Sequence, residues 1–191
     1  MAILITDKGY EEKLNALKEM NIDMDKIESC LVPLLDEKGL KIATAESCTG
    51  GMISQRITNV SGASNVFDCG VCSYGNCIKE KILGVKEETL DAFGAVSEET
   101  AKEMCEGIRA VAQSHIGIST TGIAGPTGGT KDKPVGLVYI GVAFLGKTTI
   151  YRAELCRYKQ HSRNEVRHMA ASLALALAYE ETEKYRRIEN A

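Results

Sequence analysis

The sequence has no apolar run that approaches the length of a membrane-spanning helix. Such a helix needs about 20 consecutive apolar residues, and the longest apolar stretches here are far shorter. The opening segment MAILITD, residues 1–7, has only a brief apolar run before an acidic residue, unlike a secretory signal. We therefore expect a cytoplasmic protein with no membrane partner.

An excess of basic charge is also missing. The 23 Lys and Arg residues are outnumbered by 26 Asp and Glu, which gives a net charge of −3, and the two signs are interspersed. Nucleic-acid binding usually requires a basic patch or stripe, so we expect no nucleic-acid partner. The proportions of hydrophobic (44%) and charged (26%) residues are those of an ordinary globular protein.

Histidine is scarce, and the cysteines form no ligand set. The seven cysteines are an odd number scattered along the chain, which favours reduced thiols over a disulfide framework. The closest group is Cys69-x2-Cys72-x4-Cys77, and no second pair or histidine cluster completes four zinc ligands. We expect no metal and no cofactor. With three histidines outside any motif, a Cys48–His catalytic pair is weakly supported.

The hydrophobic pattern alternates between strands and helices. The expected helices cover residues 1–22, 25–39, 49–60, 77–83, 86–92, 98–112 and 163–187; the expected strands cover 42–45, 67–74, 115–121, 135–144 and 148–156. The turn Leu145-Gly146-Lys147 joins two strands as a hairpin, so the sheet is mixed. The pattern predicts one α/β domain, a three-layer α/β/α sandwich. Residues 1–24 are expected to be a helical extension and 25–191 the main domain.

The segment TAESCTGG, residues 44–51, is the most informative in the chain. It leaves a short buried strand and enters a helix, whose first N–H groups can bind an anion or stabilise an oxyanion. Gly50 and Gly51 allow the backbone to approach a ligand closely. Ser47 or Thr49 could be a nucleophile, a phosphate ligand, or simply the helix N-cap, for which serine and threonine are favoured.

A second segment, SYGNCIK at residues 73–79, places Lys79 at the start of a short helix. A desolvated lysine loses its proton near neutral pH and can act as a general base, and Ser–Lys pairs catalyse acyl transfer without histidine. The alternative is a solvated lysine beside Glu80 and Lys81. Tyr74 could be a buried ring, a proton relay or a stacking partner for the substrate.

A third segment, TGIAGPTGG at residues 121–129, concentrates four glycines and a proline after a strand. Its backbone N–H groups could bind a phosphate or a carbonyl oxygen, although it lacks the lysine spacing of a P-loop. Arg163 and Arg167 lie four residues apart at the start of the last helix and could clamp a phosphate. Surface ion pairing, for example with Glu165, is the alternative.

Taken together, these segments resemble the CinA C-terminal domain family, over roughly residues 25–180. The resemblance rests on AESCTGG at 45–51, SYGNxxK at 73–79, GAVSE at 94–98, TGIAGP at 121–126 and KPVG at 133–136. It implies a stand-alone nicotinamide mononucleotide deamidase of the PncC type. Such an enzyme hydrolyses the carboxamide of this small-molecule nucleotide to nicotinate mononucleotide and ammonia, in pyridine nucleotide salvage.

The resemblance also implies roles for individual residues. Ser47 would be the nucleophile, Lys79 its base, and Tyr74 an assisting group. The implied substrate-binding residues are Thr49, Gly50, Gly51, Asn76, Thr121, Gly122, Gly125, Arg163 and Arg167. The family habit and the amphipathic helices lead us to expect a homodimer.

One departure from the family pattern keeps an alternative open. Members usually have serine where this chain has Gly75, so a hydroxyl beside the expected site is missing. If that hydroxyl takes part in proton transfer, the chain could have lower activity or another preferred substrate. The alternative is a nucleotide-binding or regulatory CinA-like module without catalysis.

Overall fold

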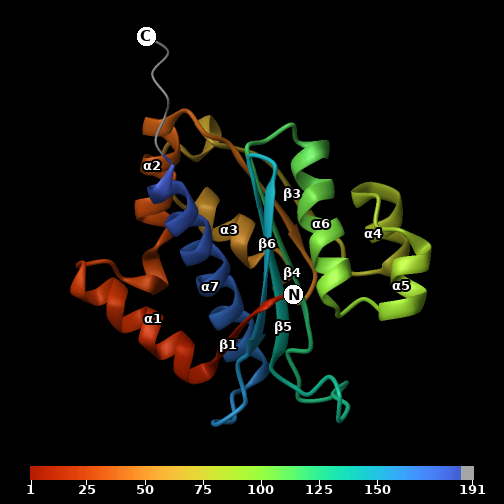
Figure 1. The fold of residues 1–191 in the computed structure, drawn as a ribbon. Coiled ribbons are helices and arrows are strands. Elements are labelled where there is room, and N and C mark those ends of the chain that lie inside the picture. Colours follow the sequence, from red (N-terminus) through yellow and green to blue (C-terminus); the bar gives the residue numbers. More distant parts are fainter. Residues whose placement is uncertain (186–191) are drawn as a thin grey trace.

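A mixed sheet lies between two layers of helices in the computed structural model, which describes residues 1–185 (Figure 1). The six strands are ordered β1-β6-β5-β4-β2-β3 across the sheet. Their bounds are β1 Ile3–Thr6, β2 Ile42–Glu46, β3 Phe67–Cys72, β4 Ile116–Gly122, β5 Leu137–Phe144 and β6 Lys147–Glu154. The predicted three-layer α/β/α sandwich with a mixed sheet is confirmed.

Helices cover both faces of the sheet. One layer contains α1 (Asp7–Glu19), α2 (Glu28–Lys38), α3 (Met52–Thr58) and α7 (Arg163–Lys184), and the other contains α4 (Asn76–Leu83), α5 (Glu87–Phe93) and α6 (Glu98–Val111). The single-turn 3₁₀ helices are η1 (Met24–Lys26) and η2 (Ala63–Asn65). Helices α6 and α7 pack on opposite faces of β4 and β5. These two central strands are buried almost throughout, as expected for strands covered on both sides.

The strand directions bring three loops together at the carboxyl ends of neighbouring strands. Strand β2 is parallel to both β3 and β4, and its last residue, Glu46, is in register with Cys72 and Thr120. The carboxyl ends of adjacent parallel strands are where ligand sites form in open α/β sheets. The segments that follow β2, β3 and β4 are the three segments that the sequence singled out.

The first strand differs from the prediction. Residues 1–22 were expected to be helical, but Ile3–Thr6 forms β1, which pairs in parallel with Tyr151–Glu154 of β6. A four-residue strand is too short to produce a clear alternating pattern, and Ile3 and Leu4 are each 51% exposed. Helix α1 begins only at Asp7. The division of the chain at residues 24 and 25 stays a prediction.

Two helix ends also differ from the prediction. Helix α3 begins at Met52 instead of Thr49, because Gly50 and Gly51 have left-handed backbone angles, with φ of 62° and 92°. Helix α7 ends at Lys184, because Tyr185 is extended with ψ of 118°. The part of the prediction that reached Arg187 lies outside the described residues.

The larger core lies between the sheet and the helices α2, α3 and α7. Leu173, Leu175 and Leu177 are all buried, so α7 is surrounded by protein along this stretch. In the same layer Arg56 donates from Nε and Nη2 to one carboxylate oxygen of Glu28, at 3.0 and 2.5 Å. Within residues 1–185 no helix combines the length and hydropathy needed to cross a bilayer.

Candidate active site

Lys79 lies in the first turns of α4 with its side chain fully buried. Its Nζ is 3.3 Å from Ser47 Oγ and donates to the carbonyl oxygens of Ser73 and Tyr74, at 2.6 and 3.3 Å. Burial lowers the pKa of this amine, since water no longer solvates the charged form. A neutral amine has two N–H donors for the two carbonyls, and its lone pair is then free to accept the Ser47 proton.

Ser47 is half-buried, and its backbone N–H donates to the carbonyl oxygen of Thr120 at 2.9 Å. The alternative of a helix-capping serine or threonine is wrong, because the N-cap of α3 is Gly51 and no N-cap side chain binds the helix. The Ser47 hydroxyl therefore has no capping function. It is available to Lys79.

The N–H groups at the start of α3 donate to the side chain of a residue that sequence reasoning missed. Glu46 is fully buried and its carboxylate accepts from the N–H groups of Gly51, Ile53 and Ser54, at 2.9, 3.1 and 2.8 Å. The expectation that these N–H groups bind a substrate anion is therefore wrong. The sequence places Glu46 shortly before a predicted helix, where a carboxylate is stabilising, but this position alone does not identify the N–H groups that it binds.

Ser47 opens onto a cavity of about 240 Å³. The cavity is lined by Ser47, Cys48, Tyr74, Gly122, Ile123, Ala124, Gly125, Thr127, Gly128 and Arg163. The predicted residues Ser47, Tyr74, Gly122, Gly125 and Arg163 thus lie around one hollow. The further lining residues between 123 and 128 belong to the glycine-rich segment but were not singled out individually.

At two positions in this wall, glycine is required for steric reasons. A Cβ atom at Gly122 would lie 2.6 Å from the carbonyl oxygen of Leu137 on the neighbouring strand. Gly125 has φ of 78°, which side chains other than glycine rarely adopt. A larger residue at either position would move the wall of the cavity.

Arg163 and Tyr74 meet at the rim of the cavity. Arg163 donates from Nη1 to the carbonyl oxygen of Gly125 at 2.9 Å and from Nη2 to the Tyr74 hydroxyl at 3.3 Å. Tyr74 is 67% exposed, so the alternative of a buried ring is wrong. The guanidinium therefore connects α7 to two of the three loops and remains open to solvent.

Arg167 has a different position from Arg163. Its Nε and Nη2 donate to the carbonyl oxygens of Cys48 and Thr49, at 3.2 and 2.9 Å. It lies outside the lining of the cavity. Since two of its donors bind the loop itself, Arg167 holds the Ser47 turn, and the structure does not place it beside Arg163 as one half of a clamp.

The remaining predicted substrate-binding residues do not line the cavity: Thr49, Gly50, Gly51, Asn76 and Thr121. The hydroxyl groups of Thr49 and Thr121 are buried, one bonded to Thr120 Oγ1 at 2.7 Å and the other to the carbonyl oxygen of Ala95. Asn76 is exposed at the first turn of α4. The buried contacts of Thr49 and Thr121 are structural, and they remove the Thr49 hydroxyl from the place where a nucleophile would be.

Cys48 is the other potential nucleophile at the cavity. Burial raises the pKa of its thiol to about 12, and the nearby Glu46 carboxylate acts in the same direction. The reactive form of cysteine is the thiolate. At neutral pH both the Cys48 thiol and the Ser47 hydroxyl keep their protons, but Ser47 has the Lys79 amine at 3.3 Å as a base and is therefore the better nucleophile.

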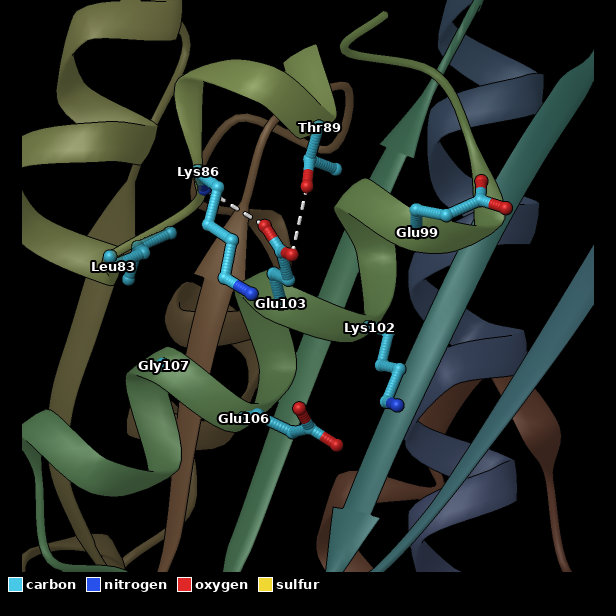
Figure 2. A pocket seen from close by; sticks show the side chains of 9 residues that line it. Leu83, Lys86, Thr89, Glu99, Lys102, Glu103, Glu106 and Gly107 are labelled. Carbon is cyan, nitrogen blue, oxygen red and sulfur yellow. Dashed lines mark hydrogen bonds between the residues drawn. The ribbon is translucent and has the colours of Figure 1, made fainter. Parts of the chain in front are cut away.

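Other hollows lie away from Ser47, among them two that are larger than this cavity. One, of about 460 Å³, lies beside α6, where Glu103 points toward Lys86 and Thr89 and accepts from the Lys86 N–H and the Thr89 hydroxyl (Figure 2). The other, of about 600 Å³, is lined by residues of α1 and the first half of α7, together with Asp25 of η1 and with Lys159 and His161 before α7. None of the predicted site residues lines either hollow. In residues 1–185, no three His, Cys, Asp or Glu side chains form a group that could hold a metal ion.

The fold and the site define a class: an α/β/α sandwich protein in which a buried lysine contacts a serine at the carboxyl ends of parallel strands. The model of the CinA C-terminal domain matches residues 24–182, and the chain belongs to this family.

Relatives and solved structures agree with this membership. A CinA-like protein of Kosmotoga olearia is 53% identical over 169 residues, which cover 88% of this chain and 40% of that protein. The competence/damage inducible protein CihA of Agrobacterium tumefaciens superposes with a TM-score of 0.78 at 35% identity, covering 84% of this chain and 96% of that one.

A competence damage-inducible protein of Klebsiella pneumoniae superposes with a TM-score of 0.79 at 31% identity, covering 85% and 99% of the two chains. The chain spans less than half the length of the curated relatives that it matches.

Proposed function

We propose that this protein is an amidohydrolase that converts nicotinamide mononucleotide and water to nicotinate mononucleotide and ammonia. The observation that carries the proposal is the 3.3 Å separation of Lys79 Nζ from Ser47 Oγ beside a cavity. A neutral amide resists attack by water, so its hydrolysis needs an activated nucleophile and a protonated leaving group. A serine with a neutral lysine can supply both. The choice of this substrate comes from the family resemblance.

In the proposed first step, Ser47 Oγ bonds to the amide carbon while Lys79 Nζ takes the hydroxyl proton. The amide oxygen gains the electron pair and becomes an oxyanion, which backbone N–H groups of the cavity loops would stabilise. The Lys79 ammonium then gives its proton to the amide nitrogen. The C–N bond breaks, ammonia leaves, and an ester remains on Ser47.

The second half-reaction returns the enzyme to its starting state. A water molecule attacks the ester carbon, and Lys79 takes one of its protons. As the C–O bond to Ser47 breaks, that proton returns to Ser47 Oγ. The product acid ionises in solution, which completes the hydrolysis with no net change in the protein.

The test is ammonia release from nicotinamide mononucleotide. Ser47→Ala and Lys79→Met are expected to lower kcat by about a thousandfold or more, since loss of a nucleophile or its base removes most of the rate enhancement of such sites. Ser64→Ala and Lys81→Met are matched controls, because both side chains are exposed away from the cavity. Wild-type protein that is stabilised by the nucleotide but releases no ammonia would overturn the proposal and favour a binding module.

Hydroxylamine distinguishes attack by Ser47 from direct attack by water. Water and hydroxylamine would compete to attack an ester on Ser47, so a hydroxamate of the nucleotide should form along with the acid. Direct hydrolysis by water forms no ester and is not expected to give this product. Mass spectrometry of the products, with Ser47→Ala as the control, separates the two mechanisms.

A further inference from the structure

Glu46 lies next to the serine of the proposed reaction and joins the end of β2 to the start of α3. Its carboxylate oxygens together accept four hydrogen bonds: Oε2 from the Gly51 and Ile53 N–H groups, and Oε1 from the N–H and hydroxyl of Ser54. The side chain has no exposed surface. All four donors belong to the turn or to α3.

These contacts close the Ser47 turn on itself. The chain leaves the sheet at Glu46, passes through Ser47, and returns at Gly51, whose N–H binds the Glu46 carboxylate. The return uses left-handed angles at Gly50 and Gly51. The Glu46 backbone is fixed as well, because its carbonyl oxygen accepts from the Ser73 N–H at 2.8 Å.

The same backbone contact connects Glu46 with the lysine. Ser73, which donates to Glu46, provides the carbonyl oxygen that accepts from Lys79 Nζ at 2.6 Å. Glu46 is therefore bonded on one side to the turn that contains Ser47 and on the other to the segment that holds Lys79. Glu46 therefore joins the two segments that carry the reacting groups, and Arg167 binds the same Ser47 turn from α7.

We propose that Glu46 is a positioning residue that keeps Ser47 Oγ within reach of Lys79 Nζ without touching the substrate. The inference rests on the proposed function for its kinetic test. Only a carboxylate suits the position, because both oxygens face N–H or O–H donors. A glutamine would turn its NH₂ group toward one pair of those donors and lose their hydrogen bonds.

The size of the effect follows from the geometry of proton transfer. A misplacement of about 1 Å in a reacting group can cost about a hundredfold in rate. We expect Glu46→Gln to lower kcat for ammonia release by about a hundredfold, with KM within about threefold of wild type. A residue that only stabilises the fold would lower the amount of folded protein but leave kcat per folded molecule unchanged.

A second readout makes the test independent of the natural substrate. Phenylmethylsulfonyl fluoride sulfonylates activated serines, and its rate of reaction with Ser47, followed by mass spectrometry, is expected to fall in parallel with kcat in Glu46→Gln. Glu28→Gln is the matched control. It removes a carboxylate acceptor of the buried Arg56, near the other end of α3, and should reduce stability while leaving both rates unchanged.

The outcomes distinguish failure of the positioning inference from failure of the proposed deamidase function. If wild-type Ser47 is sulfonylated and the Glu46→Gln rate falls, but no ammonia is released, the positioning inference stands and the deamidase proposal fails. If Glu46→Gln is folded and keeps both rates, the positioning inference is overturned. It is also overturned if wild-type Ser47 neither reacts with the reagent nor supports ammonia release.

Should Glu46→Gln fail to fold, Ser54→Ala removes one of the hydrogen bonds to Oε1. The loss of one such bond is expected to lower kcat and the sulfonylation rate by about fivefold at unchanged KM. Unchanged rates in folded Ser54→Ala would contradict the inference.

Discussion

The amine of Lys79 lies 3.3 Å from the hydroxyl oxygen of Ser47, although 32 positions separate the two residues in the chain. The lysine reaches the serine from α4, and two carbonyl oxygens from the segment before α4 fix its Nζ. Since the lysine is fully buried, its charge state depends on the protein around it. Both the proposed reaction and the stability of the fold should therefore depend on pH through Lys79.

The proposed reaction should depend on pH through Lys79. Only the neutral amine can accept the Ser47 proton, so kcat/KM should rise with pH through the pKa of Lys79. Burial lowers that pKa, so the rising limb should lie below the ordinary lysine value of about 10.4. A pH profile of ammonia release measures the limb directly. A limb at the ordinary value would mean that Lys79 is solvated in the working enzyme.

Stability should also depend on pH through the same residue. Between the lowered pKa of folded Lys79 and the ordinary value in the unfolded chain, the unfolded state binds more protons. The free energy of unfolding should therefore rise with pH across this window. Urea unfolding of wild type and Lys79→Met over this range tests it, because the difference between the two isolates Lys79. A difference that does not change with pH would contradict the lowered pKa.

Cys48 should be unreactive although it lines the cavity. Its thiol has a pKa of about 12 because it is buried, so almost no thiolate exists at neutral pH. Iodoacetamide at neutral pH should modify the exposed Cys72 and Cys77 first and leave Cys48 intact. Peptide mass spectrometry after timed alkylation identifies the modified thiols. Rapid alkylation of Cys48 with parallel loss of activity would favour Cys48 as the nucleophile.

Sequence patterns predicted the layers of the fold and the loops of the site, because both depend on local features. Hydrophobic periods identified β2, β4, β5 and α7, while the strand order that brings the segments after β2, β3 and β4 together is visible only in the structure. The pairing of Ser47 with Lys79 was expected from the family resemblance, and in the structure the two groups are in contact.

What the sequence could not predict depends on three-dimensional contacts. Arg163 and Arg167 share a helical spacing, yet one reaches the cavity rim and the other binds the carbonyl oxygens of the Ser47 turn. Glu46 could have been a solvated acid or a catalytic one, and its bonds to Gly51 and Ser54 exist only because the chain turns back there. Local spacing in the sequence specifies neither the different positions of the two arginines nor the hydrogen-bond partners of Glu46.

Gly75 gives a prediction about stability. It is the N-cap of α4, it has ordinary extended angles of φ −84° and ψ 149°, and no side chain caps the helix there. A Cβ atom would meet only Cys77 Sγ, at an ordinary contact distance of 3.7 Å. Gly75→Ser, which restores the usual family residue, should raise the free energy of unfolding by about 0.3 kcal/mol, and Gly75→Ala should lower it by about 0.5 kcal/mol.

Urea denaturation of the two Gly75 variants measures both shifts. Because Gly75 does not line the cavity, kcat for ammonia release should stay unchanged in Gly75→Ser. An increase in kcat would instead show that the restored hydroxyl takes part in proton transfer, as the departure from the family pattern first suggested.

The last prediction separates the two arginines of α7. Arg163 is exposed at the cavity rim, where its guanidinium can exchange its bonds to Gly125 and Tyr74 for bonds to a phosphate. Arg163→Met should therefore raise KM for nicotinamide mononucleotide by about tenfold, the size expected for a lost charged hydrogen bond. Nicotinamide riboside has no phosphate, so its kcat/KM should not change in this variant.

Arg167→Met should give the opposite pattern. It removes the bonds to the carbonyl oxygens of Cys48 and Thr49, which loosens the turn that presents Ser47, so kcat should fall for both substrates. Arg157→Met, at an exposed site paired with Glu154, is the control for loss of positive charge. If Arg163→Met lowers kcat/KM equally for both substrates, the phosphate does not bind at Arg163. The contact between Arg163 and Tyr74 would then matter only for the shape of the rim.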